Sequence, residues 1–164
     1  MGLYGSAITS KNGYKLINLI PFCLDIRRAV SYTIPAMRLT FFEHIGMRIE
    51  EQRAGFSKCS LTVMPHHFNS VAVVHGAVLF ALADSGMGAA LFPTLGPGEV
   101  CATIEIKINY FKPVVGGNIV CTSELINRGK TVANLESSAY VNGVLVAKAN
   151  GSFSIFKGKD VSTP

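Results

Sequence analysis

The sequence has 164 residues, 49% hydrophobic and 15% charged, a composition typical of one globular domain with a sizeable core. Its 15 Lys and Arg residues against 10 Asp and Glu give a formal net charge of +5. The basic residues are spread along the chain, which argues against a nucleic-acid-binding arm. The excess either serves solubility or attracts an anionic small molecule, such as the phosphates of a nucleotide carrier.

Residues 1–35 form an N-terminal extension whose structure the sequence does not specify. The segment LINLIPFCL has the character of a signal-peptide core, but Pro21 interrupts it, and Asp25 and two arginines follow, so secretion is not expected. The extension could cover the domain that follows, close over a pocket or contribute to assembly. The four cysteines show no metal-ligand spacing and are expected to be small core residues of a reduced, cytoplasmic protein: Cys23, Cys59, Cys101 and Cys121.

A short helix, two strands and a long helix are predicted next. AMRLTFFEHIG favours a helix, and MRIEEQRAG and FSKCSLTVM favour strands around a turn at Gly55. Residues 71–93 are long and apolar enough to cross a membrane, but His75, Asp84, Ser85, three glycines and a proline interrupt them. We therefore expect a helix buried on all sides by protein rather than a membrane span.

From Val100 onward the apolar residues recur with a period of two, which is typical of strands. Turns are predicted at Gly116-Gly117, at residues 128–130 and at Asn142-Gly143. Four consecutive strands joined by tight turns predict an antiparallel meander. The residues expected to share the inner face are Ile104, Ile106 and Ile108 on the first of these strands and Leu145, Ala147, Ala149, Phe153 and Ile155 on the last.

A sheet with one apolar face and a helix that is apolar on every side can bury each other. We therefore predict an α+β fold over residues 36–157, in which a curved antiparallel sheet is rolled around one long central helix. Residues 158–164 are predicted to be a C-terminal tail.

Polar side chains gather where the long helix begins. Gly76 stands at the start of the apolar run, so its N–H is expected to be one of the unpaired donors at a helix N-terminus. Such a donor can hold a developing oxyanion, and a glycine lets a substrate carbonyl approach the backbone. Asn69 and His75 flank this position and could bind the same oxygen or orient the loop. The alternative is a helix cap with a satisfied loop histidine.

Asp84 lies eight residues beyond Gly76 in an apolar stretch, where an unpaired carboxylate is costly. At about 1.5 Å of rise per residue the two residues are some 12 Å apart. A reacting carbon must lie roughly 3 Å from both the oxyanion donors and the nucleophile or base. Two chains about a two-fold axis could place Asp84 of one chain against Gly76 of the other. The alternatives for Asp84 are a buried acid satisfied by hydroxyls or by a basic group, and a solvent-facing residue at a helix kink.

The joint spacing of Asn69, His75-Gly76 and Asp84, followed by the strand ATIEIKINYFKPV, resembles the hotdog-fold acyl-CoA thioesterases, in particular the phenylacetate-degradation (PaaI-type) branch. The resemblance covers residues 41–156. It implies a hotdog fold, hydrolysis of acyl-CoA thioesters to free acid and CoA, and a homodimer with two composite sites that often pairs into a tetramer.

The resemblance also implies a role for each site residue. Asn69 and the Gly76 N–H would polarise the thioester carbonyl, and Asp84 of the other subunit would act as nucleophile or general base. His75 would support the loop. Thr103 matches a hydroxyl position that orients water or the carboxylate, although by parity it falls on the polar side of its strand.

Ala77 stands where the family usually has a second glycine, so a methyl group enters a position that is normally bare. The candidates for substrate binding are Ala77, Met87, Arg128 and Lys130. No cofactor, metal, nucleic acid or membrane is expected as a partner. Several apolar side chains could either shape an acyl tunnel or be ordinary core residues: Met64, Phe68, Leu79, Phe80 and Met87.

Two other functions stay open. A hotdog hydratase or dehydratase would need an acid beside the histidine for proton transfer, and the loop HHFNSVAVVHG contains none. A non-catalytic acyl-CoA sensor would keep the fold and the pocket. Asp84 argues against the sensor, whereas Ala77 is compatible with it.

Overall fold

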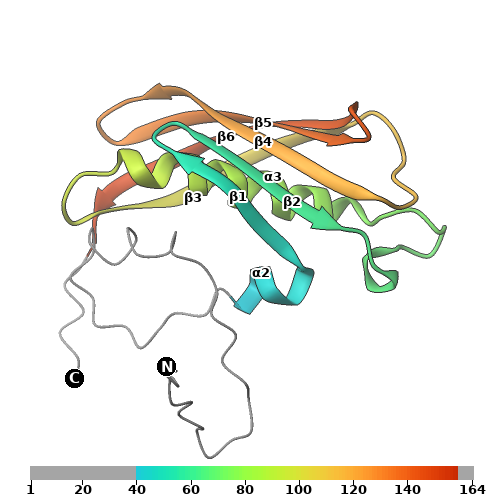
Figure 1. Cartoon of the computed structure of the whole chain (residues 1–164). Helices are drawn as coiled ribbons and strands as arrows, with labels where there is room; N and C mark the ends of the chain where they lie inside the picture. The colour runs from blue at the N-terminus through green and yellow to red at the C-terminus, as the bar shows by residue number, and fades with distance from the viewer. Residues whose placement is uncertain (1–39, 159–164) are drawn as a thin grey trace, which may run out of the picture. The chain divides into compact units, whose positions relative to one another are not determined.

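The structure, a computed structural model, describes residues 40–158 of the chain. They form an antiparallel sheet of six strands with one long helix, α3, running along one of its faces (Figure 1). The predicted α+β fold with a single central helix is therefore confirmed. The boundary predicted at residue 35, and nearly all of the predicted tail, lie outside the described residues.

The elements before the central helix follow the sequence prediction. A short helix, α2 (Thr40–Ile45), leads into the hairpin of β1 (Met47–Arg53) and β2 (Phe56–Thr62). Gly55 supplies the left-handed residue of the hairpin turn, with φ of 78°. A single turn of 3-10 helix, η2 (Pro65–His67), then precedes the loop to the central helix.

The central helix α3 (Gly76–Leu91) runs without interruption and ends in a 3-10 turn, η3 (Phe92–Thr94). Four strands follow: β3 (Glu99–Tyr110), β4 (Asn118–Arg128), β5 (Val132–Val141) and β6 (Val144–Lys157). β5 and β6 are joined at Asn142-Gly143, whose φ values of 50° and 76° are those of a type I′ turn, as the sequence predicts.

The predicted four-stranded meander is wrong in one respect. The strands lie in the order β1-β2-β4-β5-β6-β3, so β3 pairs with β6 at the sheet edge and only β4, β5 and β6 form a meander. Residues 111–117 therefore cross the sheet instead of forming a tight turn. At about 4.8 Å between strands they span roughly 14 Å, which seven residues at up to about 3.3 Å each can reach. Buried Val114 anchors this crossing, since its carbonyl accepts the Val74 N–H.

A β-bulge in β3 corrects the predicted inner face of that strand. Thr103 pairs with Phe153 and Glu105 pairs with Ser152, so Ile104 is an extra residue without a partner. Ile104 is 57% exposed, whereas Ile106 and Ile108 contact the core. Because the extra residue reverses the alternation, Thr103 lies on the helix side with Phe153, and the parity prediction for Thr103 and Ile104 is wrong.

A second bulge corrects the prediction for Leu145. Ala139 pairs with Ala147 and Tyr140 pairs with Leu145, so Val146 is the inserted residue. Val146 is 3% exposed and belongs to the core, whereas Leu145 lies on the opposite face and is half-buried. The other residues predicted for this face, including Phe153 and Ile155, are in the core as expected.

The core lies between α3 and the sheet, and α3 contacts all six strands. We call the side of α3 that faces the sheet the closed face; its buried residues are Leu79, Leu82, Ala83, Gly86, Met87 and Ala90. The residues of the opposite side, Ala77, Phe80, Ala81, Asp84 and Gly88, are exposed or half-buried, and we call them the open stripe.

The open stripe departs from the prediction of a helix buried on all sides. Its members recur at intervals of three and four residues, which places them on one side of the helix. One six-stranded sheet does not close around a helix, so this side lacks a cover within the described chain.

Gly76–Thr94 is the one helix among residues 40–158 that is long and apolar enough to cross a membrane, and it is the core helix of this fold.

Candidate active site at the start of the central helix

The loop before α3 is held in shape by backbone hydrogen bonds. The His75 N–H donates to His67 O at 2.8 Å, and the Asn69 N–H donates to Val73 O at 2.8 Å. Ala72 has φ of 60°, an uncommon value for a residue with a side chain. These bonds give the loop a defined shape, in which Asn69 pairs with Val73, three residues before the helix begins.

Asn69 uses one end of its side-chain amide to hold this loop. Its Oδ1 accepts the backbone N–H groups of Val71 and Val73, at 3.0 and 3.3 Å. Within residues 40–158 no acceptor is assigned to the opposite end, Nδ2. Asn69 thus orients the loop, which is one of the two roles predicted for it, and the binding of a substrate oxygen by Nδ2 stays a prediction.

His75 caps α3. Its Nδ1 accepts the Ala77 N–H at 3.0 Å, so the proton of the neutral ring lies on Nε2. The cap that the sequence analysis offered as an alternative role for His75 is thus present. No acceptor in the described part of the chain is assigned to the N–H of Gly76, which is half-buried. We call Asn69, His75, Gly76 and Ala77 the donor turn.

Asp84 lies in the middle of the open stripe and is half-buried. Its Oδ1 accepts a hydrogen bond from Thr103 Oγ1 at 2.8 Å. The bulge at Ile104 makes this contact possible, because it turns Thr103 toward the helix. One hydroxyl thus binds one carboxylate oxygen, and for the other, Oδ2, no partner is assigned within the described residues.

The closed face of α3 is held by buried hydroxyl groups. Ser57 Oγ donates to Gly86 O at 2.7 Å, and Ser137 Oγ donates to Ala83 O at 3.3 Å. Ser123 Oγ lies 2.6 Å from Ser137 Oγ, and all three serines are buried. We call Ser57, Ser123 and Ser137 the serine seam. These contacts hold α3 against the sheet on the side opposite Asp84.

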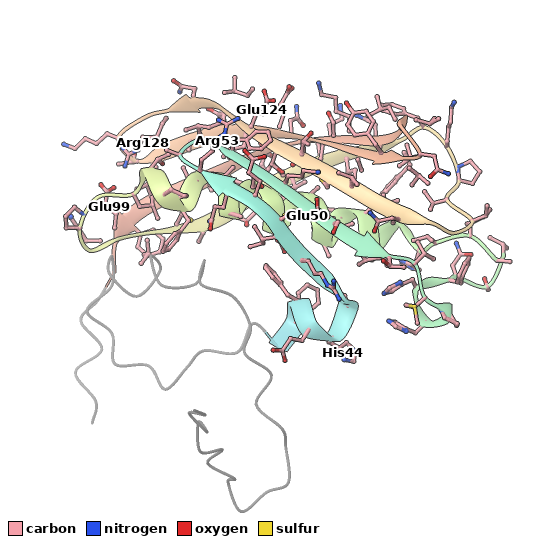
Figure 2. The ribbon with its side chains drawn as sticks, viewed as in Figure 1. His44, Glu50, Arg53, Glu99, Glu124 and Arg128 are labelled. Carbon is pink, nitrogen blue, oxygen red and sulfur yellow. The ribbon has the colours of Figure 1, made fainter. Side chains whose placement is uncertain are left out.

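The substrate-binding candidates are dispersed. Ala77 lies exposed in the donor turn, whereas Met87 is fully buried among core residues. Arg128 lies at the far end of α3, with Nη2 2.6 Å from Glu99 Oε2, and Figure 2 shows both side chains at this end of the sheet. The pKa of Glu99 is lowered, first by the hydrogen bond from the Gly96 N–H to its carboxylate and then by the charge of Arg128. The roles predicted for Met87, Arg128 and exposed Lys130 stay predictions.

The cysteines of the described chain are poor nucleophiles. Cys59 and Cys121 are fully buried core residues, as expected, and burial raises the pKa of Cys59 to about 11 and that of Cys121 to about 12. Both are therefore protonated thiols near neutral pH. Within residues 40–158 no group of three His, Cys, Asp or Glu side chains could hold a metal ion.

Tyr110 is a residue of this region that the sequence analysis missed. Its hydroxyl donates to Gly76 O at 3.0 Å, from a position 34 residues away. The sequence places Tyr110 only at the end of a predicted strand. Its proximity to Gly76 depends on β3 lying at the sheet edge, which the meander prediction did not foresee.

Two kinds of sequence comparison relate the chain to thioesterases and esterases. The model of the Thioesterase superfamily matches residues 72–146. A protein of Archaeoglobus fulgidus named "Putative esterase" is 31% identical over 113 residues, which are 68% of this chain and 71% of that protein. Acyl-coenzyme A thioesterase 13 of Mus musculus is 29% identical over 93 residues, 55% of this chain and 66% of that protein.

Solved structures show the same fold. A conserved protein of Pseudomonas aeruginosa is 30% identical with a TM-score of 0.70, over 74% of this chain and 100% of that one. A variant of the phenylacetic acid degradation protein PaaI from Thermus thermophilus is 25% identical with a TM-score of 0.65, over 70% of this chain and 97% of that one. Fold and relatives together show that the chain belongs to the thioesterase superfamily of hotdog-fold proteins, whose general chemistry is the hydrolysis of thioesters.

Proposed function

We propose that the chain hydrolyses acyl-CoA thioesters as a homodimer in which each active site joins Asp84 of one subunit to the donor turn of the other. The separation of Asp84 from Gly76 on one unbroken helix carries this proposal. Eight residues at about 1.5 Å each place them some 12 Å apart. A thioester carbon must lie roughly 3 Å from both the oxyanion donors and the attacking group, so one chain does not supply both.

The open side of the domain supports pairing with a second copy. β3 is an edge strand, and edge strands present unpaired backbone groups that another strand can meet. Phe80, one turn of α3 before Asp84, is 37% exposed, so apolar surface lies beside Asp84 on the open stripe. A two-fold axis along this side would cover the open stripe of both copies and bring each Asp84 toward the donor turn of the other.

The chemistry divides between the two halves of the site. The Gly76 N–H and Asn69 Nδ2 would donate hydrogen bonds to the carbonyl oxygen as it gains negative charge. Asp84 would either attack the carbonyl carbon or accept a proton from the attacking water. The carbon–sulfur bond then breaks, and the thiolate leaves and takes up a proton to give free CoA. Attack by water gives the free acid directly, whereas attack by Asp84 gives an acyl–Asp84 anhydride, which a water molecule must hydrolyse to release the acid and restore the carboxylate. Thr103 would orient the Asp84 carboxylate through Oδ1 and leave Oδ2 for the reaction.

The choice of CoA as the carrier rests on two observations. A mouse relative is named for hydrolysing acyl-coenzyme A, and the chain carries a net charge of +5, which would favour an anionic nucleotide. The name of the PaaI relative points to aryl acids as one acyl group to test. Because these substrates are intracellular metabolites, the proposal includes a cytoplasmic location.

Release of free thiol from a panel of aryl-, short- and long-chain acyl-CoA thioesters tests the reaction. The matching oxygen esters serve as the control, because an esterase without thioester preference would cleave both. Tight binding of acyl-CoA without release of thiol would contradict hydrolysis and favour the sensor.

Complementation tests the shared site. Asp84→Ala chains are mixed with Asn69→Ala chains, and the subunits are allowed to exchange. In a heterodimer one site carries both lesions and the other carries neither, so activity should rise to about half the wild-type value per heterodimer if the sites are independent. No recovery despite demonstrated exchange would mean that each site is built within one chain.

A further inference from the structure

Tyr110 is the last residue of β3 and reaches across to the first residue of α3. Its hydroxyl donates to Gly76 O at 3.0 Å. Its ring lies against the α-carbon of Gly76: a Cβ atom at that residue would be 3.0 Å from Cζ and 3.1 Å from the hydroxyl oxygen. Hydroxyl and ring thus hold the same residue, one through a hydrogen bond and the other through close packing.

The hydrogen bond fixes one peptide group of the donor turn. The peptide between Gly76 and Ala77 has its oxygen bound to Tyr110 and its N–H bound to His75 Nδ1, at 3.0 Å in both cases. The preceding peptide is held through His75 O, which accepts the Val78 N–H at 2.9 Å. With both planes fixed, the direction of the Gly76 N–H is set before any substrate binds, which is the condition for effective oxyanion stabilisation.

The ring contact also explains why residue 76 is a glycine. Gly76 is not among the glycines with positive φ, so its backbone conformation does not require glycine. From the sequence, the missing side chain was expected to let a substrate carbonyl approach the backbone. The structure adds a second reason, because a Cβ at this residue would be tighter against the Tyr110 ring than nine in ten real Cβ contacts, so the ring would have to shift by a few tenths of an ångström.

We propose that Tyr110 is a positioning residue, which aims the Gly76 N–H at the thioester carbonyl. This inference rests on the proposed hydrolysis of acyl-CoA. Burial raises the pKa of Tyr110 above its usual value of 10, so the hydroxyl stays protonated and can donate throughout the neutral range. Its contribution is geometric, and it should appear in kcat rather than in KM.

Tyr110→Phe removes the hydroxyl and keeps the ring. Loss of one hydrogen bond predicts a fall in kcat of about three- to tenfold with little change in KM. Tyr140→Phe is the matched control, since Tyr140 lies on the outer face of β5 and no partner is assigned to its hydroxyl within the described residues. A rise in KM with unchanged kcat would overturn the proposal, because Tyr110 would then bind substrate directly.

Amide hydrogen exchange at Ala77 gives a measurement that does not depend on activity. If Tyr110 fixes the peptide between Gly76 and Ala77, exchange at the Ala77 N–H should be faster in Tyr110→Phe than in wild type and Tyr140→Phe. Unchanged exchange overturns the positioning role even if the enzyme hydrolyses acyl-CoA. Faster exchange with unchanged kcat also overturns it, since Tyr110 would then be purely structural. A wild-type protein without hydrolysis would instead refute the proposed function and leave the exchange result intact.

A double mutant tests the ring contact. Gly76→Ala should lower Tm in the wild-type background, because the new Cβ meets the ring. In a Tyr110→Ala background the same change should lower Tm much less. An equal effect in both backgrounds would show that the ring does not account for the glycine.

Discussion

The two sides of α3 differ in whether their polar groups have hydrogen-bond partners within the described chain. On the closed face the hydroxyls of Ser57 and Ser137 meet helix carbonyls, and within residues 40–158 no buried side-chain nitrogen or oxygen lacks a partner. On the open side Asp84 has a partner for one oxygen, and none is assigned for its other oxygen or for the Gly76 N–H in the described chain. The closed face is complete by itself, whereas the open side is suited to a substrate and a second subunit.

The largest effect is expected from the open stripe. Asp84→Ala should lower kcat by about a hundredfold or more, because it removes the proposed nucleophile or base. Circular dichroism and size-exclusion chromatography should show an unchanged fold and assembly. Glu136→Gln, on the opposite face of the sheet, is the matched carboxylate control. Wild-type turnover by a dimeric Asp84→Ala protein would rule out this mechanism.

Asn69 should give the next largest effect. Asn69→Ala is expected to cost on the order of 2 to 4 kcal/mol of transition-state stabilisation, measured from kcat/KM, because one oxyanion donor is lost. Asn69→Asp keeps an oxygen for the loop N–H groups of Val71 and Val73 and removes only the donor. If the aspartate variant retained full activity, Asn69 would be a loop residue alone.

Two glycines on α3 allow the closed face and the open stripe to be compared by mutation. A Cβ at Gly86, on the closed face, would lie 2.5 Å from Ser123 Oγ, whereas at Gly88, on the open stripe, it would meet nothing within 4 Å. Gly86→Ala should lower the free energy of unfolding by about 1 to 3 kcal/mol. Gly88→Ala should be neutral or stabilise by up to about 1 kcal/mol. Urea unfolding checks both, and equal effects would contradict the difference between the two sides.

The smallest expected effect is a pH dependence from His67, which is buried beneath the donor turn. Its Nδ1 accepts the Met64 N–H at 2.9 Å and its Nε2 lies 3.0 Å from Ile45 O, an arrangement that requires a neutral ring. Burial, followed by the neighbouring His66, lowers the pKa of His67. Protonation would break the bond to Met64 and loosen the loop, because His67 O also holds the His75 N–H.

The direction of this effect follows from linkage. The unfolded chain has a histidine pKa of about 6.5, and in the folded protein the pKa of His67 is lower, so the unfolded state binds more protons between the two values. The contribution of His67 to stability is complete above about pH 6.5 and is lost as the pH falls through the folded pKa. Urea unfolding at pH 7.5 and 5.5 should show a smaller loss of stability in acid for His67→Gln than for wild type. An equal loss in both proteins would contradict this role.

The sequence allowed most of the fold to be predicted, because periodicity and turn residues are local signals, whereas the roles of the candidate site residues stay predictions. The central helix, the β1–β2 hairpin and the turn at Asn142-Gly143 all follow from such signals. The bulges at Ile104 and Val146 could not be predicted, since an inserted residue leaves the alternation of the sequence intact and shows only in the pairing with a neighbouring strand.

Non-local neighbours set the second limit. Tyr110 acquires its contact with Gly76 only because β3 pairs with β6, and no local pattern places an edge strand. The serine seam had a weak signal in the sequence. Ser57 alternates with buried Cys59 and Leu61, and a small hydroxyl residue at an inner position indicates that something approaches it closely.

The serine seam has a consequence for the orientation of α3. Hydrophobic contact has no direction, so a helix that is apolar on nearly every side could turn about its own axis at little cost. A turn of about 100°, the angle between successive residues, would carry Asp84 away from Thr103. Ser57 and Ser137 reach their carbonyls at only one angle of rotation. The serine seam therefore fixes the rotation of α3 about its axis. Directional hydrogen bonds on the closed face thus determine where the Asp84 carboxylate points on the open side.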